Sequence, residues 1–198
     1  ATIDVSGLSM DDASKVYNRS EQIIEVSGTL PKGISSVSYT GGITNVGSST
    51  ITAKFTLEST KNYNPVSDMT AVLTIIPKDI SSAVVSFTGY SNNKFNYTGS
   101  EIGDINSKLS VVLDGYALIK GTEYICEFSE LVAIGSYSET ITGTGNYTGT
   151  VTVSYDIIQK SMKLIVEEDN NTGNQQRFTY DGTVKYPSYI VKDENDNI

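Results

Sequence analysis

Apolar and polar residues alternate one by one over several stretches of the chain. The clearest alternating runs are 51–57, 69–75, 124–128 and 151–157. A period of two places successive side chains on opposite faces of a strand, so one face is buried and the other meets water, as in an antiparallel sheet. No stretch carries a sustained apolar stripe at helical spacing. The pattern therefore predicts an all-β fold.

Turn residues separate these runs. Glycine and Asp-Gly steps supply the positive backbone angles that tight turns need. The steps are Gly41-Gly42, Asp114-Gly115, Gly143-Thr144-Gly145 and Asp181-Gly182. Short strands separated by such turns at roughly eight- to twelve-residue spacing are typical of an antiparallel β-sandwich.

Landmarks recur along the chain with a period of about 80 residues, which indicates internal repeats. A turn led by tyrosine occurs at Tyr17, Tyr97 and Tyr180, and an Asn-Tyr turn occurs at Tyr63 and Tyr147. The closing strand and its exit recur as Ile75-Ile76-Pro77-Lys78 and Ile157-Ile158-Gln159-Lys160.

These landmarks divide the chain into a first repeat at 1–78, a second at 79–160 and the truncated start of a third at 161–198. Strand-only repeats in tandem contact only their neighbours, so we expect Ig-like sandwiches in an elongated arrangement. The last segment holds too little apolar surface to fold by itself. We expect it to dock on the second repeat or to pair with a neighbouring chain by strand addition.

Some turn motifs resemble a known family. Tyr180-Asp181-Gly182-Thr183, the segment 141–150 and Gly121-Thr122-Glu123-Tyr124 are similar to motifs of the YDG or MBG repeats of bacterial surface proteins. The resemblance implies an Ig-like sandwich, secretion and a place in a surface-anchored adhesin or stalk. The first repeat departs from the pattern, because Asn18-Arg19 stands where Asp-Gly is expected.

Composition narrows the classes of partner. The net charge is −9 and the pI is near 4.5, which argues against nucleic acid and against an anionic membrane surface. No apolar run approaches the length of a membrane helix. A single cysteine excludes an intramolecular disulfide. We expect an extracellular location on a bacterial cell surface.

Residues suited to catalysis are scarce. The chain has no histidine, which removes the usual general base and the commonest zinc ligand. Cys126 stands at an inward-facing position of an alternating run, as a small core residue does. There is no phosphate-binding glycine loop. We therefore expect no enzyme activity and no cofactor.

One acidic cluster matches a calcium-linker pattern. Asp193, Asn195 and Asp196 offer the hard oxygen ligands that Ca²⁺ takes. The alternative is a solvated turn, since Asp and Asn favour turns without any ion. The matching place in the second repeat is the plain Asp114-Gly115 turn, which favours that alternative.

Four tyrosines at turns form a candidate binding surface: Tyr63, Tyr97, Tyr147 and Tyr180. Exposed tyrosine rings stack on sugars or anchor a protein partner. The alternative is that the rings fold back over the end of a sandwich, as corner tyrosines do. Their recurrence at equivalent positions favours this structural role.

Three functions follow from these features. The first is a non-catalytic spacer or stalk of a bacterial surface protein, and the second is an adhesin module that binds a glycan or host protein. The third is an accessory region of a secreted enzyme. The absence of catalytic residues and the repetition favour the spacer.

Overall fold

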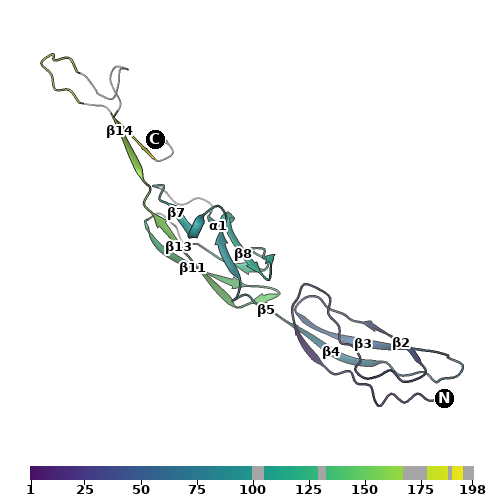
Figure 1. Cartoon of the computed structure of the whole chain (residues 1–198). Coiled ribbons are helices and arrows are strands. Elements are labelled where there is room, and N and C mark those ends of the chain that lie inside the picture. Colours follow the sequence, from purple (N-terminus) through teal and green to yellow (C-terminus); the bar gives the residue numbers. More distant parts are fainter. Residues whose placement is uncertain (100–104, 129–132, 167–177, 187–188, 194–198) are drawn as a thin grey trace. The chain divides into compact units, whose positions relative to one another are not determined.

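The computed structural model describes residues 1–99, 105–128, 133–166, 178–186 and 189–193 (Figure 1). The structure is 46% strand and only 4% helix, which confirms the all-β prediction. Within the described ranges the helices are limited to α1 (Ile105–Lys108) and the 3₁₀ turn η1 (Ser91–Asn93). No helix among them is long and apolar enough to span a membrane.

The chain forms two compact units, and each is built from several separate segments. Unit 1 comprises Ala1–Ser86, Leu109–Glu127 and Glu139–Val153, and unit 2 comprises Phe87–Lys108, Phe128–Ser138 and Ser154–Ile198. The repeat boundaries expected from the sequence stay a prediction.

A first sheet of four strands lies wholly within unit 1 and has the order β1-β4-β3-β2. Its strands are β1 (Ala13–Val16), β2 (Ile34–Thr40), β3 (Gly47–Leu57) and β4 (Met69–Ile76). β2 pairs with β3 and β3 with β4 in antiparallel fashion, whereas β1 runs parallel to β4.

Burial alternates along the first sheet as the sequence predicts. Ile51 and Leu73 are 0% exposed, while their neighbours Thr50 and Val72 are exposed. The buried face removes apolar surface from water, and at about 25 cal/mol per Å² this burial is the main stabilising contribution of such a sheet.

A second sheet has the order β10-β11-β13-β7. Its strands are β7 (Lys94–Asn96), β10 (Tyr124–Ile125), β11 (Gly135–Gly143) and β13 (Thr150–Ile158). β10 is antiparallel to β11, and β7 runs parallel to β13. In both sheets the first strand in the sequence, β1 or β7, is short and lies at one edge. It runs parallel to the last strand of the sheet, β4 or β13.

Three smaller sheets complete the architecture, and they are formed by β6-β8-β9, β5-β12 and β14-β15. Their strands are β5 (Lys78–Asp79), β6 (Val84–Phe87), β8 (Leu109–Leu113), β9 (Tyr116–Ala117), β12 (Tyr147–Thr148), β14 (Met162–Val166) and β15 (Tyr189–Asp193). β5 is parallel to β12, and β14 is antiparallel to β15. Pairing of 161–198 with a neighbouring chain stays a prediction.

Unit 2 has an aromatic core. The rings of Phe87 and Phe95 meet edge to face with centroids 5.1 Å apart, and both residues are buried. Tyr155 packs against Phe87 at 5.5 Å and stacks on Tyr137 at 5.7 Å. Such aromatic pairs contribute about 0.5–1.5 kcal/mol each beyond the area they bury.

The parallel pairs are a departure from the antiparallel sheets expected from the sequence. An alternating pattern fixes which side chains face the core, but it is the same for both strand directions. β1 and β4 are joined by a long connection that contains β2 and β3, and such a crossover brings two strands together in parallel.

Candidate functional site

Two of the tyrosine-led turns, those at Tyr17 and Tyr97, are attached to the sheets in the same way. Tyr17 donates its backbone N–H to the carbonyl of Ile76 at 3.0 Å, immediately after β1. Tyr97 donates its backbone N–H to the carbonyl of Ile158 at 2.8 Å, immediately after β7. Each bond therefore extends a parallel strand pair by one residue.

The third residue of each turn has a left-handed backbone conformation. Gly99 and Gly182 have φ of 82° and 84°, and Arg19 has φ of 70°. Glycine adopts this region freely, whereas a residue with a Cβ pays about 1–2 kcal/mol. Strain of this kind persists where the surroundings stabilise it, and at this position the surroundings are the contacts of the arginine side chain.

The guanidinium of Arg19 reaches a residue 104 positions away, and both lie in unit 1. Its Nη2 donates to Oε1 of Glu123 at 3.0 Å. Glu123 is itself held in place, because its Oε2 accepts the backbone N–H of Ile119 at 2.8 Å. The carboxylate thus binds the arginine and its own loop at once.

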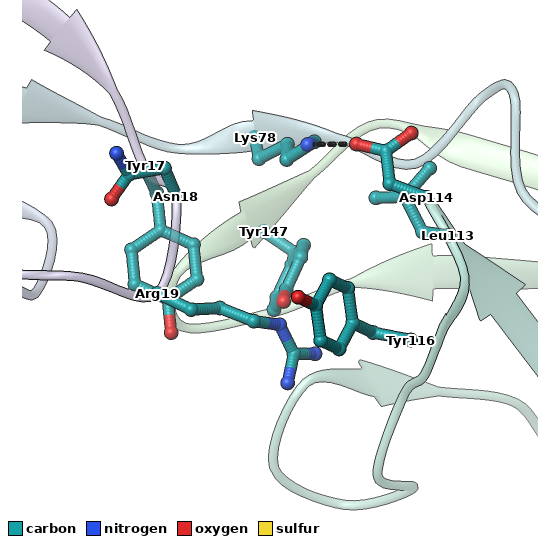
Figure 2. A pocket seen from close by; sticks show the side chains of 8 residues that line it. All are labelled: Tyr17, Asn18, Arg19, Lys78, Leu113, Asp114, Tyr116 and Tyr147. Carbon is teal, nitrogen blue, oxygen red and sulfur yellow. Dashed lines mark hydrogen bonds and ion pairs between the residues drawn. The ribbon is translucent and has the colours of Figure 1, made fainter.

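Two tyrosine rings also contact this guanidinium, as Figure 2 shows. The Cζ atom of Arg19 lies 5.0 Å from the ring centroid of Tyr116 and 5.7 Å from that of Tyr147. A cation at this distance is attracted by the negative face of the ring. The arginine side chain is therefore held by one ion pair and two aromatic contacts.

Tyr17, the first residue of the turn, packs on Tyr147. Their ring centroids are 5.4 Å apart and the rings are nearly perpendicular at 82°. The two residues are 8% and 4% exposed. Burial raises the pKa of the Tyr147 hydroxyl; the charge of Glu123 adds to this shift, and Arg19 opposes it. We call these five residues, Tyr17, Arg19, Tyr116, Glu123 and Tyr147, the Arg19 contact.

Two further links lie beside the Arg19 contact in unit 1. The Lys78 ammonium pairs with the Asp114 carboxylate, as drawn in Figure 2. The Asn146 side chain accepts the backbone N–H of Val46 at 2.8 Å and donates to Oδ1 of Asn45 at 3.0 Å. Each link joins segments that are far apart in the sequence.

A small hollow of about 80 Å³ opens among these residues. It is lined by Tyr17, Asn18, Arg19, Lys78, Leu113, Asp114, Tyr116 and Tyr147. Ligand pockets usually measure about 300–1,000 Å³, so this hollow has room for a few water molecules only. Both of its cations are already bound to carboxylates of the protein. The arrangement is suited to holding segments of the chain together.

The four tyrosines of the candidate binding surface lie in different environments. Tyr180 is 91% exposed, Tyr63 and Tyr97 are half-buried, and Tyr147 is buried in the Arg19 contact. The ring of Tyr147 packs on that of Tyr17. A shared binding surface stays a prediction.

The calcium candidates fall mostly outside the described residues. Asp193 is the last residue of β15, while Asn195 and Asp196 lie beyond the described ranges. Within those ranges, no three His, Cys, Asp or Glu side chains are grouped so that they could hold a metal ion. Calcium binding by these three residues stays a prediction.

Cys126 is 3% exposed, as its inward-facing position predicts. Burial raises the pKa of its thiol, with Lys120 opposing this shift and Glu139 adding to it. A thiol with a raised pKa carries little thiolate, the form that acts as a nucleophile. The environment is that of a core residue.

Sequence reasoning missed the Arg19 contact. A signal was present, because Arg19 occupies a position that is glycine in the other two tyrosine-led turns. Its partners could not be identified, since Tyr116 lies in no motif and the motif that contains Glu123 does not indicate an arginine partner. No family model, curated protein or solved structure matches this chain.

Proposed function

We propose that this chain is a non-catalytic spacer from a bacterial cell-surface protein, built from tandem Ig-like β-sandwich repeats of the MBG or YDG type. The observation that carries the proposal is the Arg19 contact. It joins segments about 100 residues apart through a strained backbone position and two buried rings, and the hollow that these residues line measures only about 80 Å³, too small for a typical ligand.

The strand orders support the repeat part of the proposal. The first sheet has the order β1-β4-β3-β2, and the second read from β7 has the order β7-β13-β11-β10. Each strand of one sheet has a counterpart at the same place in the other. Tyr17 and Tyr97 follow β1 and β7 with the same backbone hydrogen bond. Two repeats with one topology account for both correspondences.

A spacer needs successive repeats that do not swing freely, because a flexible stalk does not hold what it carries at a fixed distance. Contacts between consecutive domains are ordinarily modest, and relative motion is the default. The Arg19 contact, the Lys78–Asp114 pair and the Asn146 hydrogen bonds join residues of 1–78 to residues of 79–160. They supply the restraint that a stiff stalk requires.

The adhesin alternative draws on one observation, the exposure of Tyr180 together with other exposed apolar side chains nearby. Val184 and Tyr186 are 74% and 79% exposed, and Phe178 is 40% exposed. Exposed aromatic residues are frequent in carbohydrate and protein recognition. The accessory-region alternative rests on no particular feature of the described residues.

A binding array separates spacer from adhesin. The whole chain is probed against glycans and extracellular-matrix proteins, with calcium and with a chelator, alongside a Tyr180→Ala, Tyr186→Ala variant. We expect no saturable signal in either condition. A specific signal that is lost in the variant would contradict the spacer proposal and support an adhesin. A signal present only with calcium would implicate the cluster at Asp193.

A further inference from the structure

In both four-stranded sheets, an early strand lies parallel to the last strand. β1 pairs with β4 from Ala13↔Leu73 to Val16↔Ile76. β7 pairs with β13 from Lys94↔Asp156 to Asn96↔Ile158. The first pair lies in unit 1 and the second in unit 2. The same feature therefore occurs independently in each unit.

Parallel pairing determines how tension along the chain acts on these ladders. The chain enters at the amino end of β1 and leaves at the carboxyl end of β4. Tension therefore pulls the two strands from opposite ends of their ladder and loads its hydrogen bonds along the strand axis, all at once. If both strands were pulled from the same end, the bonds would break one after another.

Contacts around β1 lengthen this ladder at both ends. At the amino end, the Asp12 carboxylate accepts the backbone N–H of Val72 at 2.6 Å. At the carboxyl end, Tyr17 donates to the carbonyl of Ile76. Residues 12–17 are therefore bound along 72–76 without interruption. A single hydrogen bond contributes little to stability, but several that must break at the same time resist force together.

A third parallel pair lies at the boundary between the first and second repeats. Lys78 donates its backbone N–H to the carbonyl of Asn146 at 3.0 Å, and Ile80 donates to that of Thr148 at 2.9 Å. This short pair, β5 with β12, is oriented like the other two. Force transmitted through the chain meets it before it reaches β7.

We propose that β1–β4 and β7–β13 are mechanical clamps, which make each four-stranded sheet resist unfolding under tension along the chain. This inference rests on the proposed function, because a spacer exposed to pulling is where such resistance matters. The resistance is kinetic. Forced unfolding is governed by the height of the barrier, so it can change without a change in equilibrium stability.

Single-molecule force spectroscopy tests the clamp by comparing two pulling geometries on one protein. On a Cys126→Ala background, one handle is at the carboxyl terminus and the other is either at the amino terminus or at Ser20→Cys. Ser20 is exposed and follows the tyrosine-led turn, so force applied there bypasses β1. The β7–β13 pair is loaded equally in both geometries and is the internal control.

We expect the first repeat to unfold about tenfold more slowly at a given force from the amino terminus than from Ser20, a barrier difference of ~1.4 kcal/mol. The second repeat is expected to unfold at the same rate in both geometries. Equal rates for the first repeat would overturn the clamp. Equal rates would not affect the proposal that the chain is a spacer. A ligand found on the binding array would contradict the spacer proposal but not the clamp.

Two proline variants check that the ladder itself carries the resistance. β1 is an edge strand, and bonds in a parallel ladder fall on alternate residues. Since Tyr17 donates to β4, Lys15 also presents its N–H to β4 and Val16 does not. Lys15→Pro should bring the amino-terminal unfolding rate to that of the Ser20 geometry, and Val16→Pro should not. A Lys15→Ala variant controls for the side-chain bond from Lys15 Nζ to the Ile23 carbonyl. Identical effects of the two prolines would contradict the proposal.

Discussion

The Arg19 guanidinium donates a 3.0 Å hydrogen bond to the Glu123 carboxylate while its backbone occupies a left-handed conformation. The strained backbone and the side-chain contact occur at the same residue. Glycine occupies this position at Gly99 and Gly182, where no Cβ strains the left-handed backbone, whereas Arg19 accepts that strain and contributes its side-chain contacts. This contact is the centre of the spacer account.

Truncating Arg19 separates the contact from the strain. We expect Arg19→Ala to lower the free energy of unfolding by about 1–2 kcal/mol, because it removes a charged hydrogen bond and two cation–π contacts but keeps a Cβ at positive φ. Arg19→Gly should cost about 1 kcal/mol less than Arg19→Ala, since it relieves the backbone. Urea unfolding measures both. If the alanine variant matched the wild type, the contact would have no energetic role.

The Tyr17–Tyr147 pair is tested by a double-mutant cycle. Tyr17→Leu and Tyr147→Leu should show a coupling of about 0.5–1.5 kcal/mol, because the two rings meet edge to face. Tyr180→Leu serves as the control. Since Tyr180 is 91% exposed, its replacement should change stability by less than about 0.5 kcal/mol. Additive effects of Tyr17→Leu and Tyr147→Leu would refute the pairing.

Two glycines with similar backbone angles differ in what surrounds them. A Cβ on Gly41 would lie 2.1 Å from the Thr50 carbonyl oxygen, whereas a Cβ on Gly115 would meet nothing within 4 Å. Gly115→Ala should cost only the conformational strain of about 1–2 kcal/mol. Gly41→Ala should cost at least about 2 kcal/mol more, because β2 and β3 must separate at their turn. Thermal unfolding of the two variants gives the difference, and equal losses would show that the turn yields freely.

Stability should fall at alkaline pH. Burial raises the pKa of Cys126 and of Tyr124 in the folded protein. A raised pKa means that the unfolded state loses its proton first, so stability present below the ordinary value is lost as pH rises above it. For the thiol that ordinary value is 9.0. Unfolding measured between pH 7 and 11 should show the loss beginning near pH 9, and Cys126→Ala should reduce it. A flat profile would contradict the burial of these groups.

Much of the sheet structure could be predicted from the sequence, because a strand with one buried face has apolar residues at every second position. The run 51–57 lies in β3 and the run 151–157 lies in β13, with inward positions such as Ile51 and Ile157 buried. Turn glycines could also be predicted, because tight turns require backbone angles that favour glycine. Gly41 and Gly115 have φ of 91° and 82°, which other residues rarely adopt.

Strand direction and the Arg19 contact were not readable. Side chains alternate between the two faces of a strand whether it runs with its neighbour or against it, so the residues of β1 and β7 do not indicate a parallel pairing. The contact depends on side chains about 100 positions apart, so the departure at Asn18-Arg19 marks an unusual turn but does not identify its partners. The burial of Tyr147 follows from its packing on Tyr17, which no local pattern of the Asn-Tyr turn encodes.

The most direct test of the central claim is a distance distribution across the Arg19 contact, measured by pulsed electron paramagnetic resonance. Spin labels are placed at Thr56 in β3 and Thr152 in β13, both exposed positions of unit 1, on a Cys126→Ala background. The spacer account predicts one narrow distribution in the wild type and a broader one in Arg19→Ala. A wild-type distribution that is already broad, or one that Arg19→Ala leaves unchanged, would contradict the claim that this contact fixes successive repeats.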